Sequence, residues 1–540
     1  MIKKIYQKIF EGSFAKISGA ALLLGGASLA SRLLGVLRDR ILAGTFGAGD
    51  ELDVYYAAFR FPDLIFNLIV LGALSAGFIP VFSKLFHQEK KQDAWALVNN
   101  IFNILLALVA ALALILLVAA PWLLKLLTPG FSAAKIDQAV ALTRIMALSP
   151  LLLGASAVLS GLLQSLRRFF TFAVAPIFYN LGIIVGAVFL VDRFGLAGLA
   201  WGVVLGALGH FLVQLPSLRG TGYRYKFLFN LRQKGLRAIG RLMVPRFLSL
   251  VLLQANFVAI TVIASFLAAG SLAVFNLAYN IWSFPLGIFA VSFAVAAFPT
   301  LSELVAKNDW AGFRRTFIYA LRQILFYLVP ASALFIVLRA QIVRVILGTG
   351  KFSWSDTILT IDTLNFLTLG LFAEGLILLL FRAFFALHNA RTPFLVGLFG
   401  SILKISGAWF FGLKLGAPGL ALGFSAGSVG QMILLWIFLE KLVGHFAPHE
   451  ILRGGLKICL ASLLAGVAGW SGLQLGARLV DTHTGHGILA QGVMAGLLGV
   501  LVYLLAASAL RLKESRQLIG ALFAKISFGK IKIGERVADL

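Results

Sequence analysis

The chain alternates long apolar stretches with short polar ones. A helix needs about 20 mostly apolar residues to cross the hydrocarbon core of a bilayer, and fourteen stretches have that length. We therefore predict an all-α polytopic membrane protein with about fourteen transmembrane helices. The predicted spans are 17–44, 53–82, 94–126, 138–163, 170–192, 195–216, 238–267, 271–302, 316–341, 357–386, 393–413, 416–439, 452–477 and 486–510.

Part of this pattern occurs twice. The stretch FGLAGLAWGVVLGALGH at 194–210 aligns with LGAPGLALGFSAGSVGQ at 415–431, a shift of 221 residues, and Pro62 aligns with Pro285 at a shift of 223. Six predicted helices fit within that period, so the two halves have the same orientation and form a parallel repeat, an arrangement found in transporters. The predicted domains are an N-lobe at 1–220, a C-lobe at 221–445, two further helices at 446–512 and a basic cytoplasmic tail at 513–540.

Composition agrees with a membrane protein, and charge predicts its orientation. The chain is 60% hydrophobic and 13% charged, whereas a soluble domain is about half apolar and about a quarter charged. Lys and Arg concentrate at both termini and in the even-numbered loops, as at Lys90, Arg167, Arg224 and Arg315. Basic loops stay in the cytoplasm, so both termini are predicted to be cytoplasmic. The net charge of +26 then indicates anionic membrane lipids as neighbours rather than nucleic acid.

Charged residues within the first two predicted helices are the strongest functional signal. Arg32 lies about twelve residues, or roughly 18 Å, from the end of the first predicted helix, which places it near the middle of the bilayer. Arg38 in the first helix and Arg60 in the second lie nearer the outer face of the membrane. Burying such charges toward lipid costs at least about 2.5 kcal/mol each, so they must face a cavity or pair. Two interpretations stay open. The arginines line a cationic cavity for an anionic, phosphate-bearing substrate, or Asp39, Asp53 and Asp63 hold some of them in structural ion pairs, and the two do not exclude each other.

Other charges within the predicted helices are weaker signals. Glu374 and Lys404 could pair between the tenth and eleventh helices, and Arg246 in the seventh could add a cation to the cavity. The sequence has no P-loop, no His/Asp cluster with metal-ligand spacing and no nucleophile elbow. We therefore expect a protein that is not an enzyme and has no catalytic residue, metal site or cofactor.

Five stretches, in order along the chain, resemble the MurJ (MviN) family. They are ASRLLGVLRDRILAGTFGAGDELDVYYAAFRFPDL, GALSAGFIPVF, FPLGIFAVSFAVAAFPTLSE, GKFSWSD and FRAFFALHNARTPF. The resemblance implies a flippase of the multidrug/oligosaccharidyl-lipid/polysaccharide exporter superfamily. Its substrate would be lipid II, the undecaprenyl-diphosphate-linked glycopeptide precursor of peptidoglycan, carried across the bacterial inner membrane by alternating access. It also implies functional roles for Arg32, Arg38 and Asp53, and Arg60 lies where the family often has a basic residue.

Two positions depart from the family pattern. The family carries an arginine in the second helix where this chain has Phe66 and Asn67, and another in the eighth helix where it has Asn280. The second lobe therefore lacks its expected cation, which leaves open how a diphosphate is held between the lobes. Two alternatives also stay open: an exporter of another lipid-linked glycan or small molecule in the same superfamily, and a membrane scaffold without transport.

The sequence thus predicts a lipid II flippase that acts as a monomer. Membrane potential or an ion gradient could drive it. The predicted substrate-binding residues are Arg32, Arg38, Asp39, Asp53, Arg60 and Asn280, with Arg246, Glu374 and Lys404 as accessory candidates.

Overall fold

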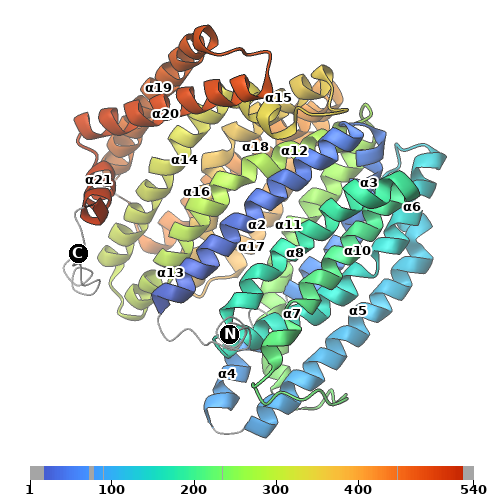
Figure 1. The fold of residues 1–540 in the computed structure, drawn as a ribbon. Helices are drawn as coiled ribbons and strands as arrows, with labels where there is room; N and C mark the ends of the chain where they lie inside the picture. The colour runs from blue at the N-terminus through green and yellow to red at the C-terminus, as the bar shows by residue number, and fades with distance from the viewer. Residues whose placement is uncertain (1–16, 72–77, 89–90, 234, 447, 527–540) are drawn as a thin grey trace, which may run out of the picture. The chain divides into compact units, whose positions relative to one another are not determined.

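The computed structural model describes residues 17–71, 78–88, 91–233, 235–446 and 448–526. Within these ranges the regular structure is helical throughout, without strands (Figure 1). The helices up to the middle of the chain are α2 (Ile17–Phe46), α3 (Asp50–Ile65), η2 (Phe66–Leu71), α4 (Ile79–His87), α5 (Lys91–Leu127), α6 (Ala133–Met146), α7 (Ser149–Ser165), α8 (Phe169–Val185), η4 (Gly186–Leu190), α9 (Val191–Phe194), α10 (Leu196–Leu212), η5 (Leu215–Leu218) and α11 (Leu236–Ser265). The remaining helices are α12 (Ser271–Pro285), η6 (Leu286–Ala290), α13 (Val291–Ala306), α14 (Trp310–Leu347), α15 (Trp354–Leu369), α16 (Leu371–Ala386), α17 (Arg391–Leu415), α18 (Ala417–Val443), α19 (Pro448–Leu479), α20 (Gly485–Ala509) and α21 (Lys513–Ile526).

Most of these helices are built to cross a membrane. Among the described residues, ten helical runs are long and apolar enough, or eleven if the pair α15 and α16, bent by 43°, is one span. On α5 the side chains of Trp122 and Leu126 are 69% and 77% exposed, which is favourable only against lipid. The helices α2, α3 and α11 lie where three further spans were predicted. The all-α membrane fold is confirmed, and a total of fourteen spans is compatible with it.

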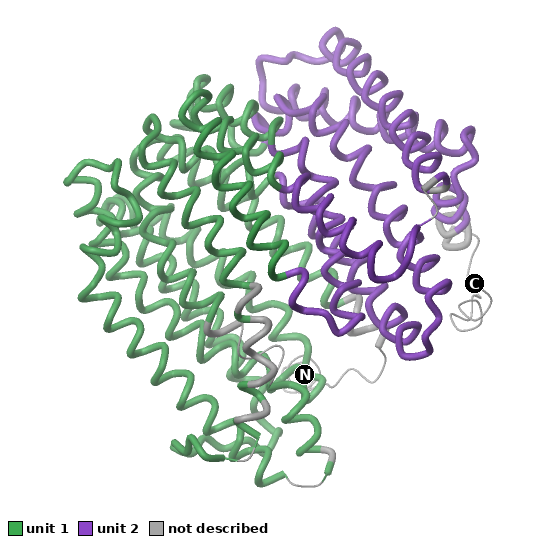
Figure 2. Tube along the Cα trace, turned by 180° about the vertical axis from the view of Figure 1, so that it is seen from behind, with its two compact units in different colours: residues 1–281, 346–366, 394–427 green, residues 282–345, 367–393, 428–540 purple. Residues whose placement is uncertain are grey.

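The chain divides into two compact units (Figure 2). Unit 1 contains residues 1–281, 346–366 and 394–427, and unit 2 contains 282–345, 367–393 and 428–540. This division differs from the predicted lobe boundaries at 220 and 445, because α11 packs against α3 and α5 and so joins unit 1. The predicted boundaries stay a prediction. Helix α21 accounts for the first part of the predicted tail, and residues 527–540 lie outside the described residues.

The predicted sequence repeat is visible in local geometry within unit 1. Gly195 and Gly416 both adopt positive φ, 56° and 68°, a conformation that glycine adopts at little cost. Each then begins a helix in the same way, since the N–H of Gly198 donates to Gly195 O and that of Gly419 to Gly416 O, both at 2.9 Å. The two halves of the sequence repeat therefore fold into equivalent local structures here.

A second pair of equivalent positions marks irregular turns. Pro62 lies within α3 and Pro285 ends α12. Wide π-helical turns follow both, η2 at Phe66–Leu71 and η6 at Leu286–Ala290. Proline cannot donate the backbone hydrogen bond of a regular helix, and a π turn accommodates one extra residue within a helix.

The two helices beyond the repeat correspond to α19 and α20 in unit 2. Their glycine-rich face brings the two helices close together. A Cβ atom on Gly472 would lie 2.8 Å from Cα of Ala495, and one on Gly476 would lie 3.0 Å from Cγ of Gln491. These glycines therefore serve helix packing, as small residues do between membrane helices.

Candidate functional site

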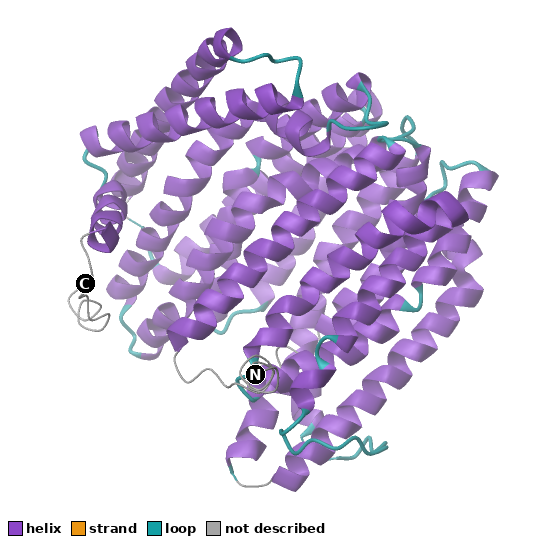
Figure 3. Ribbon diagram, viewed as in Figure 1, coloured by secondary structure: helices purple, strands orange, loops and turns teal. Residues whose placement is uncertain are grey.

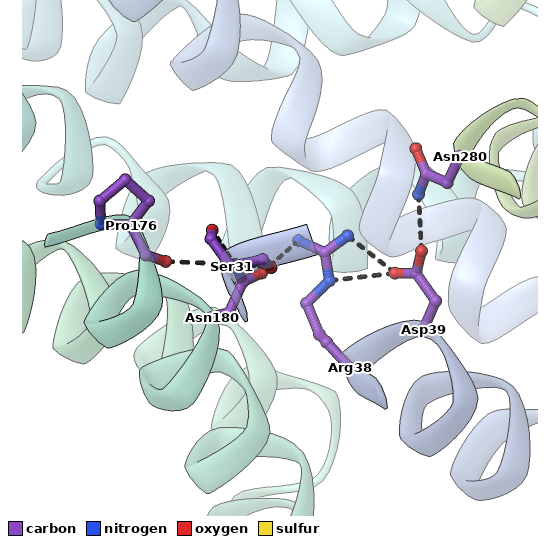
Figure 4. Close-up of polar contacts among 6 residues, drawn as sticks. All are labelled: Ser31, Arg38, Asp39, Pro176, Asn180 and Asn280. Carbon is purple, nitrogen blue, oxygen red and sulfur yellow. Dashed lines mark hydrogen bonds and ion pairs between the residues drawn. The ribbon is translucent and has the colours of Figure 1, made fainter. Parts of the chain in front are cut away.

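Arg38 and Asp39 on α2 form an ion pair that connects several helices of unit 1 (Figure 4). Arg38 donates from Nε and Nη2 to Oδ1 of Asp39, at 3.0 and 2.7 Å. The other carboxylate oxygen, Oδ2, accepts from Nδ2 of Asn280 on α12 at 2.9 Å. Asp39 is only 4% exposed. Its buried carboxylate accepts hydrogen bonds from Arg38 on α2 and from Asn280 on α12, and so links these two helices.

Asn180 on α8 holds the opposite side of the Arg38 guanidinium (Figure 4). Its Oδ1 accepts from Nη1 of Arg38 at 3.1 Å. Its Nδ2 donates to the carbonyl of Pro176 at 3.1 Å and to that of Ser31 at 3.4 Å. The guanidinium is thus fixed between a carboxylate and an amide, which defines its orientation. Asn180 is not among the predicted site residues, because a single asparagine in an apolar span does not by itself indicate a binding site.

Arg60 on α3 lies among residues of α11. Its Nε donates to Oγ1 of Thr261 at 3.1 Å, and its guanidinium carbon lies 5.4 Å from the ring centroid of Phe257. Arginine stacks readily on aromatic rings while its edge keeps free N–H groups. Arg60 is 8% exposed, so its charge is held inside unit 1.

Asp63 introduces a negative charge one turn further along α3. Its Oδ2 accepts from Nε2 of Gln254 on α11 at a long 3.5 Å. Its carbonyl accepts from Nδ2 of Asn67 at 3.0 Å. Asn67, one of the two residues where the family pattern expects an arginine, therefore binds its own helix.

These residues surround one cavity with a volume of about 360 Å³. That lies at the small end of the range of about 300–1,000 Å³ for ligand pockets. Its charged lining residues are two arginines and one aspartate. The remaining walls are amide and aromatic, and Tyr279 contacts Phe257 edge to face at 5.0 Å. The lining residues are Arg38, Leu42, Tyr55, Tyr56, Phe59, Arg60, Asp63, Asn67, Ile183, Leu250, Leu253, Gln254, Phe257, Asn276, Tyr279 and Asn280.

Three of the six predicted site residues line this cavity, namely Arg38, Arg60 and Asn280. Asp39 does not line it but accepts hydrogen bonds from Arg38 and Asn280. Arg32 does not line it. That residue is half-buried about 9 Å earlier along α2, with no hydrogen bond in the described parts of the chain.

Asp53 is placed at the end of a helix instead of in the cavity. Its Oδ2 accepts from the backbone N–H of Gly270 at 2.7 Å and its Oδ1 from that of Ala273 at 2.8 Å. It therefore caps the N-terminus of α12, where a negative charge also interacts favourably with the helix dipole. A side chain from α3 thereby holds the start of the helix that carries Asn280.

The accessory candidates have separate surroundings. Lys404 on α17 is buried, with Nζ 4.8 Å from the ring centroid of Phe424. Glu374 on α16 accepts from Oγ of Ser428 at 2.6 Å in unit 2. The pairing of Lys404 with Glu374 stays a prediction. Arg246 lies on α11 in a stretch whose side chains are outside the described residues.

Most of the neutral polar residues that line the cavity were not among the predicted site residues. Gln254 and Asn276 are single amides within apolar helices, and Tyr55 and Tyr56 lie in the charged stretch that drew attention to its arginines. Only the fold shows that these residues meet around one space. Across the described ranges, no group of three His, Cys, Asp or Glu side chains could hold a metal ion.

Comparison with known proteins gives consistent matches. A family model described as "Lipid II flippase MurJ" matches residues 42–485, beginning just after Arg38 and Asp39. A probable lipid II flippase MurJ of Treponema pallidum is 27% identical over 488 residues, covering 88% of this chain and 91% of that protein. For the corresponding protein of Thermotoga maritima the identity is 29% over 490 residues, covering 91% and 96%.

Solved structures agree. A lipid II flippase MurJ in an inward closed conformation matches with a TM-score of 0.75 at 27% identity, over 92% of this chain and 100% of that one. An inward-facing MATE transporter matches with a TM-score of 0.66 at 16% identity, over 76% and 94%, which is a likeness of fold alone.

Proposed function

The chain belongs to the MurJ family, and on that premise we propose that it moves lipid II from the cytoplasmic to the outer leaflet of the bacterial inner membrane. Its fold is that of a multi-pass membrane protein. The substrate would enter with its diphosphate and sugars in the protein and its polyprenyl tail in lipid. We further propose cytoplasmic termini, a monomeric protein, and membrane potential or an ion gradient as the driving force.

The observation that carries this proposal is the buried guanidinium of Arg60. A guanidinium has five N–H donors, and Arg60 uses Nε for Thr261. Its four Nη hydrogens have no hydrogen-bond acceptor among the described residues, although the side chain lines the cavity. A buried charge without acceptors is costly, so an anionic ligand that supplies acceptors would bind there favourably. The oxygens of a diphosphate match the planar fork of arginine.

Amides take the place of the missing second cation in this proposal. Gln254, Asn276 and Asn280 line the cavity from α11 and α12. Without ligand, their NH₂ groups donate to Asp63, to the carbonyl of Leu272 and to Asp39. Amides donate hydrogen bonds without adding charge. The diphosphate would therefore be held electrostatically by Arg38 and Arg60 and by neutral hydrogen bonds from the other wall.

The cavity is smaller than the glycopeptide of lipid II, so it would receive the diphosphate end and widen to accept the sugars. No bond is made or broken. The residues bind and release an anion on opposite sides of the membrane, and selectivity comes from the match of charge and hydrogen-bond donors.

A different lipid-linked glycan is the second candidate, because a diphosphate linkage alone satisfies Arg38 and Arg60. A carrier of organic cations is disfavoured, since the cavity has two arginines and one carboxylate, the opposite of what a cation requires.

Binding of purified lipid II to the full-length protein in nanodiscs tests the proposal. Arg60→Ala should weaken binding about 10- to 100-fold, the equivalent of about 1.5–3 kcal/mol for hydrogen bonds to a charged group. Arg60→Lys should bind at an intermediate level because lysine lacks the fork. Arg144→Ala is the matched control, since Arg144 is an exposed arginine of unit 1 outside the cavity.

Complementation of cells depleted of their own lipid II flippase provides the activity readout. The wild-type protein and Arg144→Ala should restore growth, and Arg60→Ala should not. Unchanged lipid II affinity in a well-folded Arg60→Ala protein would overturn the proposed site. Failure of the wild type to complement, combined with tight binding of another undecaprenyl-diphosphate glycan, would identify the second candidate as the substrate.

A further inference from the structure

The connection between η5 and α11 is held over its middle part, residues 223–230, by side chains of one neighbouring helix. Residues 219–233, here called the strap, form the longest stretch without regular helix in the described ranges (Figure 3). Two of the side chains that hold it come from α5. Nδ2 of Asn99 donates to the carbonyl of Arg224 at 3.0 Å, and Nδ2 of Asn103 to that of Leu228 at 3.1 Å.

A third asparagine completes the attachment. Nδ2 of Asn100 donates to the carbonyl of Asn230, and the N–H of Asn230 donates back to Oδ1 of Asn100, both at 2.7 Å. The hydroxyls of Tyr223 and Tyr225 donate to the side-chain oxygens of the other two asparagines at 2.9 and 2.8 Å. All three asparagines are at most 5% exposed, so the strap has a defined position and is not a loose linker.

The asparagines also set the level of the strap relative to the bilayer. From Ile104 to Leu124, α5 carries only apolar and aromatic side chains, a length of about 31 Å at 1.5 Å per residue and about the thickness of the hydrocarbon core. Asn103 therefore lies at the boundary between hydrocarbon and headgroups. Along the strap the bonded partner changes from Asn99 to Asn103 and back to Asn100, so the strap extends toward the bilayer by about one helical turn and returns.

The part of the strap that reaches furthest toward the bilayer exposes large apolar side chains. Phe227 is 76% and Phe229 52% exposed. Leu231, which follows the return of the strap to Asn100, is 66% exposed. Aromatic side chains are enriched at the membrane interface. The strap has no acidic residue, and its basic residues are Arg219, Arg224, Lys226 and Arg232.

We propose that the strap is a binding site for anionic phospholipid headgroups. Phe227 and Phe229 insert at the boundary of the acyl chains, and the basic side chains contact lipid phosphates. The three asparagines of α5 donate to the strap carbonyls of Arg224, Lys226, Leu228 and Asn230, and Asn100 also accepts from the N–H of Asn230. These bonds lower the cost of placing an extended segment at this depth. Anionic lipid is favoured over an acidic protein because it presents negative charge and apolar chains together at the level fixed by Asn103.

The first test measures depth. Cys459 is the only cysteine of the chain, so Phe227→Cys can be spin-labelled alone in a Cys459→Ser background. In nanodiscs containing phosphatidylglycerol, the label should be more accessible to oxygen than to a water-soluble nickel relaxant. Gln92→Cys, at an exposed position near the start of α5, is the aqueous control and should show the reverse. Aqueous accessibility at both positions would overturn the proposal and favour a soluble acidic partner.

The second test measures lipid selectivity by native mass spectrometry of the full-length protein. The triple variant Arg224→Gln/Lys226→Gln/Arg232→Gln should lose its preference for phosphatidylglycerol over phosphatidylcholine at least tenfold. The double variant Arg224→Lys/Arg232→Lys keeps the charge and should retain the preference. Equal phosphatidylglycerol retention by wild type and triple variant, with both eluting as folded protein, would contradict the assignment.

The third test addresses the attachment. Asn103→Leu removes the donor that holds the apex while keeping a side chain of similar size. In nanodiscs, the spin label at Phe227→Cys should then become at least tenfold less accessible to oxygen relative to the nickel relaxant, because the carbonyls of Lys226 and Leu228 lose the donor that holds them at this depth. Asn256→Leu is a comparison variant, because Asn256 is a buried asparagine on α11 that bonds Ser401 instead of the strap. Unchanged accessibility of the label in Asn103→Leu would show that Asn103 does not set the level of the strap relative to the bilayer.

Discussion

Replacement of Asn280 by arginine restores the positive charge that the family pattern has at this position, and tests whether that charge strengthens lipid II binding. In the structure, Nδ2 of Asn280 donates to Oδ2 of Asp39 at 2.9 Å, while Arg38 occupies Oδ1 of the same carboxylate. An arginine at this position would therefore meet a carboxylate that is already in place. We expect Asn280→Arg to be tolerated and to bind lipid II more tightly.

The magnitude follows from charges around Asp39. At an effective dielectric constant of about 20, attraction to Asp39 at about 4 Å contributes about 4 kcal/mol, and repulsion from Arg38 at about 6 Å removes about 3 kcal/mol. The remaining gain of about 1 kcal/mol is smaller than the cost of desolvating a buried charge, which is several kcal/mol. The protein without ligand should therefore lose about 2–3 kcal/mol of stability. A bound diphosphate adds further attraction, and we expect lipid II affinity to rise about tenfold, or about 1.4 kcal/mol.

The assay compares lipid II binding and thermal stability in nanodiscs. Asn280→Gln is the control for a longer side chain without charge and should bind like wild type. Asp39→Asn/Asn280→Arg removes the acceptor and should express poorly, so a double-mutant cycle should give a coupling energy of at least about 1.5 kcal/mol. Weaker lipid II binding by a well-expressed Asn280→Arg protein would refute this reasoning and favour a less anionic substrate.

Two further predictions concern the helix cap and the topology. Asp53→Asn should destabilise the protein by about 1–2 kcal/mol, because an amide replaces the charged acceptor of two N–H groups at the start of α12; an unchanged melting temperature would contradict the capping role. In a Cys459→Ser background, cysteines at Gly49 and Ser355 should react with an impermeant thiol reagent in intact cells and one at Gln92 should not. Labelling at Gln92 alone would reverse the predicted orientation.

The arginines of the site could be predicted from sequence, because a charged side chain within an apolar span is costly unless it faces a cavity or an ion-pair partner. Arg38 and Arg60 were identified in this way. Their neutral partners were not, since Asn180 and Gln254 could equally have served helix packing or faced other polar groups. A single asparagine in a membrane helix costs too little to indicate a function by itself.

Contacts between residues far apart in the chain could not be predicted from the sequence, for a different reason. Asp53 was predicted to bind substrate, yet its partners Gly270 and Ala273 are more than 200 positions away and contribute only backbone N–H groups. Because almost every residue has a backbone N–H, no pattern of side chains in the sequence indicates such a bond. The lobe boundary at 220 was placed at the most polar interruption, while the packing of α11 against α3 and α5 is a property of the folded chain.

The π turn after Pro285 has a consequence for movement. Residues in an α-helix are spaced 100° apart around the axis, and a π turn holds one residue more than an α turn. If η6 tightened to α geometry, everything beyond it on α13 would rotate by about 100° relative to α12 with little change in length. A different set of side chains would then face the neighbouring helices. The turn that follows Pro62 contains Asn67, which lines the cavity, so tightening of this turn would redirect the Asn67 side chain while α3 stays in place.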